Sequence, residues 1–467
     1  MEIYFIFILI VLFILAISDL IFGVANDAVN FLNSAIGSKV APRHIILIFA
    51  SVGILIGVLL SGGMMEVARK GLFNPHMFTY PEVMAIFVAV MFADVLLLDM
   101  FNTFGLPTST TVSIIFSILG ASFAMASINT IGAHGDLNAV LEYINTDRAF
   151  LIISGIFLSV IISFIVGSIV QFIVRSFFTF NYRPRLKYLG GVFSAIALTS
   201  LTYFIFTKGI NSTIFSDTPI GNLIKSEPGN FILYSAVMWF IIFQSIILIF
   251  PKINILKSIV IIGTGSLALA FAANDLVNFI GVPLAGFNAF EAVQKNPNLT
   301  NMDALNQPIE VNFFFLLGAG AIMAATIWFS KKASTVTKTE VNLASEQKGK
   351  EKFKKSFVAK GVVNLFLFFS GMVRMIIPGS VLEYINSRFD KNLHQPHLEE
   401  AEKKAPFDLL RASVNLVVAS SLISFATSLK LPLSTTFVTF IVAMGTSFSD
   451  RAWGKDCLLY TSTLPTT

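Results

Sequence analysis

One heptapeptide occurs twice in this chain: residues 25–31 read ANDAVNF, and residues 273–279 read ANDLVNF. A second pattern is also duplicated, as LPTSTT at 106–111 and LPLSTT at 431–436. Within each pair the two copies differ at one position, and the two patterns follow in the same order in both halves of the chain. The sequence is therefore built from two related halves.

The spacing of the patterns locates an insertion in the second half. Asn26 and Pro107 are 81 positions apart, whereas Asn274 and Pro432 are 158 positions apart. The difference nearly equals the length of a polar stretch at 331–406 that is rich in Lys, Glu and Ser. The second half is thus interpreted as the first half with a cytoplasmic loop added. A weakly apolar patch within this loop, at 357–386, is open to two interpretations, a pair of interfacial helices or a partly disordered linker.

Composition places the chain in a membrane. Of 467 residues, 55% are hydrophobic and 13% are charged, and the mean hydropathy is +0.79. Soluble domains carry about 25% charged residues, so lipid is the expected solvent here. The net charge of +5 falls in short clusters between apolar runs rather than on a basic face, which argues against nucleic acid as a partner. The opening apolar stretch has no basic n-region and is expected to be a retained membrane helix.

The apolar runs predict an all-α integral membrane protein with about 11 membrane segments. The expected segments are 3–22, 43–61, 82–101, 110–130, 149–174, 186–207, 230–250, 258–273, 311–330, 407–429 and 433–448.

Basic residues in the connecting loops predict the orientation. Lys and Arg cluster at 39–43, 175–187, 252–257 and 331–360, whereas the loops at 131–148 and 283–310 are acidic or neutral. The basic loops are assigned to the cytoplasm, which leaves the amino terminus outside. The helix that leads into Asn26 then runs inward and the helix that leads into Asn274 runs outward.

The two halves are therefore expected to be inverted repeats, the architecture of secondary transporters with broken or re-entrant helices. The expected division is 1–190 for the first repeat, 191–250 for connecting helices and 251–456 for the second repeat with its insertion at 331–406.

The duplicated Asn-Asp motif predicts a cation site. Asp27 and Asp275 lie in apolar runs that contain no Lys or Arg, and a carboxylate at the bilayer centre costs about 2.5–3.5 kcal/mol unless it is compensated. Hard cations prefer oxygen ligands, and unwound backbone at the motif would add carbonyl oxygens. The alternative is a polar kink or an interhelical hydrogen bond. The candidate ligands are Asn26, Asp27, Asn30, Asn274, Asp275 and Asn278.

The duplicated Ser-Thr-Thr motif predicts an anion site. Pro followed by Ser and Thr is typical of a helix start, and such a start in the middle of a membrane offers N–H groups, hydroxyls and a positive dipole end. Alternatively, these hydroxyls only bond the preceding turn. The candidate residues are Ser109, Thr110, Thr111, Ser434, Thr435 and Thr436.

Other acids and the histidines carry less information. Asp94 and Asp99 are interpreted either as a proton or cation relay or as residues that face a polar cavity, and Asp19 and Asp408 as structural residues near segment ends. The five histidines fall in loops or at a helix end, so a Ser-His hydrolase would lack its base. An enzyme is not expected.

These motifs, together with Asp450–Gly454 (DRAWG), resemble the inorganic phosphate transporter (PiT) family over most of the chain, from Phe22 to Asp456. The resemblance implies a multi-pass protein of the cell membrane that imports phosphate by symport with Na⁺ or H⁺, in which the Asn-Asp residues bind the cation and the Ser-Thr-Thr residues bind phosphate. It also implies a homodimer. No cofactor is expected beyond the transported ion. A sulfate permease on the same scaffold and a passive anion channel are the alternatives.

The sequence departs from the family pattern in two places. The residues before Asn26 and Asn274 are Gly23-Val24-Ala25 and Phe271-Ala272-Ala273, where the family usually has Gly-x-Asn-Asp, so the backbone there is less free to break. The family also continues after the DRAWG segment into another helix, a twelfth segment. Here the chain ends in 457–467. Residues 457–462 can be back-translated into a common sequencing-adapter sequence, and 457–467 is interpreted as a non-native tail.

Overall fold

The computed structural model describes residues 2–61, 72–131, 137–211, 218–296, 302, 305, 312–343, 378–390, 393, 405–429, 431 and 433–451. Within these ranges the chain is helical, and its only β contact is an isolated bridge between Phe73 and Ile144. The suspected tail at 457–467 and most of the patch at 357–386 lie outside the described residues.

Among the described residues, eight helices are long and apolar enough to cross a membrane, and a bent pair of helices at 313–342 makes a ninth span if it is counted as one. They are α1 (Glu2–Gly37), α4 (Tyr80–Phe104), α5 (Thr110–Ile131), α7 (Thr146–Phe178), α8 (Arg183–Asn211), α10 (Pro228–Ile249), α11 (Ile255–Lys295) and α17 (Leu409–Ser428). Shorter helices are α2 (Arg43–Leu59), α6 (Leu137–Glu142), α9 (Pro219–Ser226), α12 (Phe313–Phe329), α13 (Lys331–Leu343), α15 (Gly379–Arg388) and α18 (Thr435–Ser449). Each of the eleven expected segments overlaps one of these helices.

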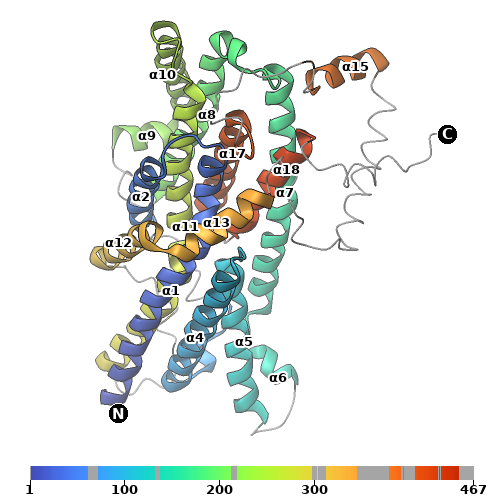
Figure 1. Cartoon of the computed structure of the whole chain (residues 1–467). Coiled ribbons are helices and arrows are strands. Elements are labelled where there is room, and N and C mark those ends of the chain that lie inside the picture. The colour runs from blue at the N-terminus through green and yellow to red at the C-terminus, as the bar shows by residue number, and fades with distance from the viewer. Residues whose placement is uncertain are drawn as a thin grey trace, which may run out of the picture.

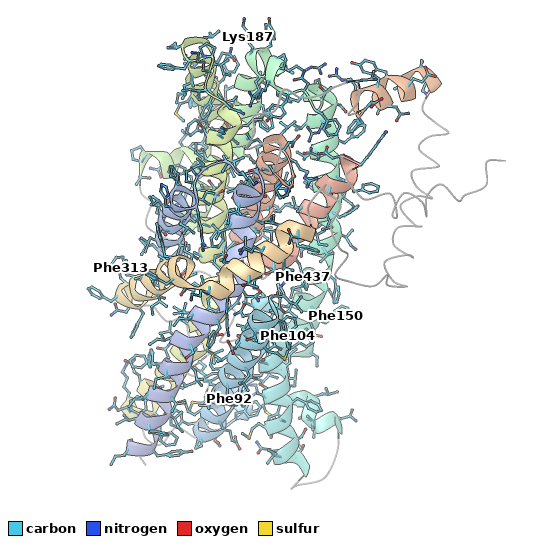
Figure 2. The ribbon with its side chains drawn as sticks, in the orientation of Figure 1. Phe92, Phe104, Phe150, Lys187, Phe313 and Phe437 are labelled. Carbon is cyan, nitrogen blue, oxygen red and sulfur yellow. The ribbon has the colours of Figure 1, made fainter. Side chains whose placement is uncertain are left out.

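The outer surface is apolar, as a membrane protein requires. Phe92, Phe150 and Phe313 are 55%, 75% and 54% exposed, and Figure 2 shows them on different helices of the bundle. The exposed Lys187 lies at one end of the molecule, where α8 begins. Because so many large apolar side chains face outward, lipid is the medium that covers them, and the chain is a multi-pass membrane protein.

The two longest helices, α1 and α11, cross at the centre of the molecule (Figure 1). Phe13 contacts Phe287 edge to face with ring centroids 6.2 Å apart, and Phe31 contacts Phe271 at 5.2 Å. Residue numbers thus rise along α1 as they fall along α11, so the two helices run antiparallel. Both Asn-Asp motifs lie in the crossing and are buried.

The unwound backbone expected at the Asn-Asp motifs is a wrong prediction. α1 continues through its motif to Gly37 and α11 continues through its motif to Lys295 without interruption. The polar side chains there bond to other helices, so the backbone keeps its own hydrogen bonds, as a buried apolar environment demands.

The chain breaks at the Ser-Thr-Thr motifs, where two helical hairpins turn. α4 ends at Gly105, whose φ of 65° is in the left-handed region that glycine tolerates, and α5 begins at Thr110. The far ends of this hairpin meet through the backbone, since Asn74 donates to the Tyr143 carbonyl at 2.9 Å and Asn145 to that of Leu72 at 3.1 Å. α17 and α18 form the second hairpin, in the opposite half of the molecule (Figure 1).

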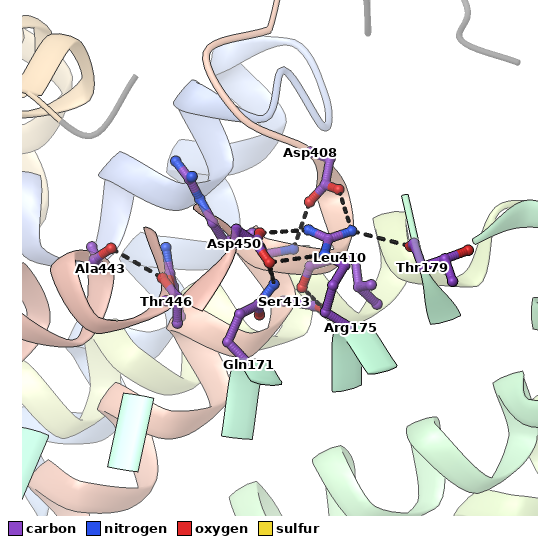
Figure 3. A network of polar contacts seen from close by, with 11 residues as sticks. Gln171, Arg175, Thr179, Asp408, Leu410, Ser413, Ala443, Thr446 and Asp450 are labelled. Carbon is purple, nitrogen blue, oxygen red and sulfur yellow. Dashed lines mark hydrogen bonds and ion pairs between the residues drawn. The ribbon is translucent and has the colours of Figure 1, made fainter. Parts of the chain in front are cut away.

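Arg175 of α7 ties together the two ends of the second hairpin (Figure 3). Its guanidinium binds Asp408, just before α17, at 2.7 Å, and Asp450, just after α18, at 2.6 Å. Gln171 donates to both Asp450 oxygens at 2.9 Å. Burial alone would raise the pKa of the Asp408 carboxyl, but the charge and hydrogen bonds of Arg175 outweigh it and hold that pKa below its usual value. The structural role expected for Asp408 is confirmed.

The first residues of the expected insertion are not a loop. Residues 331–343 form α13, which is bent by 69° from α12 and crosses the centre of the molecule against α1 (Figure 1). Glu340 of α13 is buried and accepts a hydrogen bond from Asn33 at 2.6 Å, and Lys332 pairs with Asp99 of α4. The insertion therefore begins after α13. Sequence reasoning missed this helix because its sequence is polar, yet Lys332 and Glu340 bond to neighbouring helices, and its Thr hydroxyls donate to carbonyls one turn earlier in the same helix.

Candidate functional site

Asp27 lies between the tips of the two hairpins. Its carboxylate accepts hydrogen bonds from Thr110 at 2.8 Å and from Thr436 at 2.9 Å. Thr110 opens α5 in the first half of the chain, and Thr436 lies in the first turn of α18 in the second half. All three side chains are buried. The Asp27 carboxylate thus bonds to the hairpin tip of its own half of the chain and to the hairpin tip of the other half.

Asp275 makes the same set of contacts with the halves exchanged. Its carboxylate accepts from Thr111 of the first half at 3.1 Å and from Thr435 of the second half. It also interacts electrostatically with Asp27 across the α1–α11 crossing. Each of the two carboxylates therefore accepts a hydrogen bond from one threonine of its own half of the chain and from one threonine of the other half.

Asn30 and Asn278, one helical turn beyond the acids, reach across in the same exchanged manner. Asn30 donates to Thr436 at 3.1 Å and Asn278 donates to Thr111 at 3.1 Å. Each also donates to the acid on its own helix, Asn30 to Asp27 at 3.4 Å and Asn278 to Asp275 at 3.0 Å. Exchanging the two halves of the chain leaves this pattern of contacts nearly unchanged.

Asn26 and Asn274 bond to the hairpin of their own half. The Asn26 side chain donates to the Leu106 carbonyl at 3.0 Å and accepts from the Thr108 N–H at 2.8 Å. Asn274 donates to the Leu433 carbonyl at 3.3 Å. These amides fix the turns of the hairpins, a role that sequence reasoning did not assign. Their predicted role as cation ligands stays a prediction.

Ser109 and Ser434 act as helix N-caps. The Ser109 hydroxyl accepts from the Val112 N–H at 3.2 Å, and the Ser434 hydroxyl accepts from the Phe437 N–H at 3.1 Å. The expected helix starts at both motifs are confirmed. Capping leaves the earlier N–H groups of α5 and α18 outside the intrahelical ladder, and Thr111 of one tip donates to the Leu433 carbonyl of the other at 3.2 Å. Two positive helix ends therefore meet at the same place.

The structure brings together all twelve site residues that the sequence singled out, in one buried cluster. Among the described residues, neither Asp27 nor Asp275 forms an ion pair with Lys or Arg. Two adjacent carboxylates without a basic partner are unstable when both are charged, whereas cations held by carboxylate, amide and hydroxyl oxygens would neutralise them. The arrangement suits a cation site next to an anion site at the helix ends.

Sequence reasoning missed a further buried acid, Asp19. Because the first segment was expected to end at residue 22, Asp19 was placed near a segment end, but α1 runs on to Gly37 and Asp19 lies in its interior with an exposed fraction of 0%. It interacts with Asp94 of α4. Asp94 and Asp99 were interpreted either as a proton or cation relay or as residues that face a polar cavity. In the structure Asp94 is buried, whereas Asp99 is 40% exposed and paired with Lys332.

A model of the phosphate transporter family matches residues 23–339, which include both Asn-Asp motifs and the first hairpin. The chain belongs to this family. Membership of the family agrees with the expectation that the chain transports a solute and is not an enzyme.

Curated relatives in the family are distant. A candidate phosphate permease of Thermococcus kodakarensis is 26% identical over 280 residues, which cover 57% of this chain and 63% of the relative. One from Pyrococcus abyssi is 26% identical over 267 residues, covering 55% and 61%, and one from Helicobacter pylori is 24% identical over 281 residues, covering 56% and 48%. The chain thus spans less than two thirds of the length of these relatives.

A solved structure shares the fold of this chain. It is titled "The sodium-dependent phosphate transporter", and it matches with a TM-score of 0.62 and 18% identity over 95% of this chain and 90% of its own. At this identity the likeness establishes the fold.

Proposed function

We propose that this protein imports inorganic phosphate together with cations by alternating access. The observation that carries the proposal is the central cluster. In it, two buried carboxylates that form no ion pair with any Lys or Arg in the described ranges accept hydrogen bonds from four threonine hydroxyls, where two helix ends meet. Family membership and the names of the relatives support phosphate as the substrate.

The anion half of the site uses the ends of α5 and α18. Their N–H groups, dipoles and Thr hydroxyls supply donors to a tetrahedral oxyanion from two directions, without a Lys or Arg. The hydroxyls of Thr110, Thr111, Thr435 and Thr436 donate to the two carboxylates. When a cation takes over those carboxylates, the hydroxyls are free to turn toward the anion. Cation and anion binding therefore favour each other.

The negative charge of phosphate requires that cations be transported together with it. A charge that crosses 100 mV changes its free energy by about 2.3 kcal/mol, so a divalent phosphate that enters a negative interior alone loses about twice that amount. Two cations make the step neutral and a third lets the potential assist it. Asp27 and Asp275, with Asn30 and Asn278, provide two matching sets of cation ligands.

The exchanged contacts support an inverted repeat and hence alternating access. α1 and α11 run antiparallel, and the two hairpins enter the centre from opposite ends of the molecule (Figure 1). A rearrangement of one half relative to the other would open the shared site first to one side and then to the other.

Uptake by purified protein in proteoliposomes tests the proposal. With an inward gradient of Na⁺ or H⁺, labelled phosphate should accumulate above its external concentration, and excess phosphate or arsenate should abolish the signal whereas sulfate should not. Liposomes without a cation gradient serve as the control. Accumulation that only reaches equilibrium would identify a passive channel, and competition by sulfate would identify a sulfate permease.

A further inference from the structure

Helix α13 lies across the end of the first hairpin and reaches α1 (Figure 1). Lys332, at the start of α13, donates to Thr103 in the last turn of α4 at 3.2 Å. Thr335 packs so closely on Gly105, the residue that ends α4, that a Cβ there would lie 2.9 Å from the Thr335 Cγ2 atom. Glu340, near the other end of α13, bonds to α1. A segment from the second half of the chain therefore holds two helices of the first half.

The contact between Glu340 and α1 lacks one hydrogen-bond donor. Glu340 and Asn33 are 1% and 4% exposed, and the Asn33 amide donates to Glu340 Oε1 at 2.6 Å. The other carboxyl oxygen, Oε2, and the Asn33 amide oxygen, Oδ1, are buried, and no described residue donates to either of them. Buried polar atoms in native proteins almost always have a partner. Because these two acceptors belong to side chains that already bond to each other, a single donor between them would satisfy both.

No positive charge offsets an ionised carboxylate at this contact. In the ranges that the structure describes, the glutamate forms no ion pair. On its own helix, Lys332 is about 12 Å away and is paired with Asp99 of α4, and Lys331 and Lys338 are exposed. On α1, Asp27 lies about 9 Å before the contact. A buried carboxylate without a positive partner is costly, and such a group takes up a proton instead.

We propose that Glu340 carries a proton, through which it latches α13 to α1, and that loss of this proton releases the helix. A protonated carboxyl group has one O–H donor. Its Oε2–H donates to Asn33 Oδ1 while the Asn33 amide donates to Oε1, so two hydrogen bonds in one ring satisfy both acceptors. Without the proton, Oε2 and Oδ1 are two acceptors with no hydrogen between them. Proton loss therefore removes one bond and leaves a buried charge, and both effects favour release of α13.

The latch joins the two halves of the chain beside the central cluster. Asn33 is one turn beyond Asn30, which bonds to Thr436, and Gly105 directly precedes the motif at 106–111. While α13 is docked, α1 and the tip of the first hairpin are held to a segment of the second half. The halves must move relative to one another in alternating access, so release of α13 permits that movement. This consequence rests on the proposed function, whereas the proton and the latch do not.

Infrared spectroscopy of the purified full-length protein in detergent, without phosphate, tests the proton. Wild type should show the C=O stretch of a protonated carboxyl group at about pH 7, where an exposed Glu, which titrates near about 4.3, is ionised. Glu340→Gln should lack this band in the difference spectrum, and Asn33→Leu should shift it to higher frequency because its hydrogen bonds are lost. Glu291→Gln, which replaces a half-exposed acid paired with Lys295, is the matched control and should leave the band in place.

The distance between α13 and α4 tests the latch. Spin labels at Lys338→Cys and Leu96→Cys, both exposed positions, report that distance in a Cys457→Ser background. With Glu340 present, the ratio of docked to released α13 should fall by up to about tenfold per pH unit once the proton is lost, because one proton is linked to docking. Docking is thus fully present at acidic pH and is lost as the pH rises. With Glu340→Gln, whose amide N–H donates to Asn33 Oδ1 at every pH, the distance should stay constant.

Three results would overturn the inference. The first is a carboxyl band that neither Glu340→Gln nor Asn33→Leu alters, and the second is a distance that stays constant into alkaline pH with Glu340 present. The third is release of α13 at every pH in Glu340→Gln, which would assign a water molecule that bridges an ionised Glu340 to Asn33. Size-exclusion profiles identify a variant that does not fold, and Asn33→Leu with the pH titration of the wild-type band then carries the test. Since neither measurement needs phosphate or an ion gradient, failure of the latch is distinguishable from failure of phosphate uptake.

Discussion

At the scale of single residues, each central carboxylate depends on hydroxyls from both halves of the chain. Asp27 is held by Thr110 and Thr436, and Asp275 by Thr111 and Thr435. Duplication identified these residues in the sequence, because a costly buried acid that recurs at the same place in two halves is under a shared physical requirement. Which threonine would meet which acid could not be predicted, since the partners from the other half lie 409 positions from Asp27 and 164 positions from Asp275.

Replacing either carboxylate with its amide tests the cation role. Asp27→Asn and Asp275→Asn remove the charge but keep the shape, so each should weaken cation binding by about 2–5 kcal/mol, roughly thirtyfold or more. Cation-dependent phosphate uptake in proteoliposomes should fall accordingly at the ion concentration that half-saturates wild type. The exposed Asp147→Asn at the start of α7 is the control. Full uptake by either central variant, at equal protein in the membrane, would refute the assignment.

At the scale of elements, the positions of the helices were predictable but two of their ends were not. The apolar runs located all eleven expected segments, yet α1 and α11 extend past the Asn-Asp motifs where breaks were expected. A polar motif in an apolar run indicates that its side chains need hydrogen-bond partners. The sequence does not say whether these are backbone groups of an unwound helix or side chains of another helix. The insertion boundary failed for a related reason, because α13 is polar but packs against α1.

The second hairpin depends on one buried arginine. Arg175 is fully buried between Asp408 and Asp450, so Arg175→Met leaves a buried carboxylate without its partner and should lower stability by about 3–5 kcal/mol. Arg175→Met with Asp450→Asn should recover part of the loss, because it removes the unpaired charge. Thermal unfolding in detergent is the measurement. As the control, the exposed Lys187→Met should change stability by less than about 0.5 kcal/mol. If Arg175→Met were as stable as wild type, the two ion pairs of Arg175 would not stabilise the hairpin.

At the scale of the whole molecule, the basic loops and the two hairpins define opposite ends. Lys187 lies at the end of the molecule opposite to α6 (Figures 1 and 2). The positive-inside rule assigns that end to the cytoplasm and α6 to the exterior. The antiparallel crossing of α1 and α11 agrees with the opposite directions that the loop charges gave to these helices. Lys331 and Lys332 are an exception, since they belong to α13 at the centre.

Sidedness can be measured by labelling single cysteines in intact cells. In a Cys457→Ser background, Leu141→Cys on α6 should react with a membrane-impermeant maleimide, whereas Lys252→Cys should react only after the membrane is permeabilised. Leu141 is 44% exposed and Lys252 lies in an exposed turn, so both thiols are accessible to solvent on their own side. The reverse pattern of labelling would invert the orientation and place the amino terminus inside.

The sequence by itself determined that the chain is a helical membrane protein of two related halves, and it picked out the twelve residues of the central cluster. It could do so because hydropathy and duplication are local properties that need no knowledge of folding. The tertiary structure decided how those residues meet, that the helices stay intact at the Asn-Asp motifs, and that Asp19 faces Asp94. These depend on which side chains lie across from one another on different helices, and packing fixes that only when the whole chain is assembled.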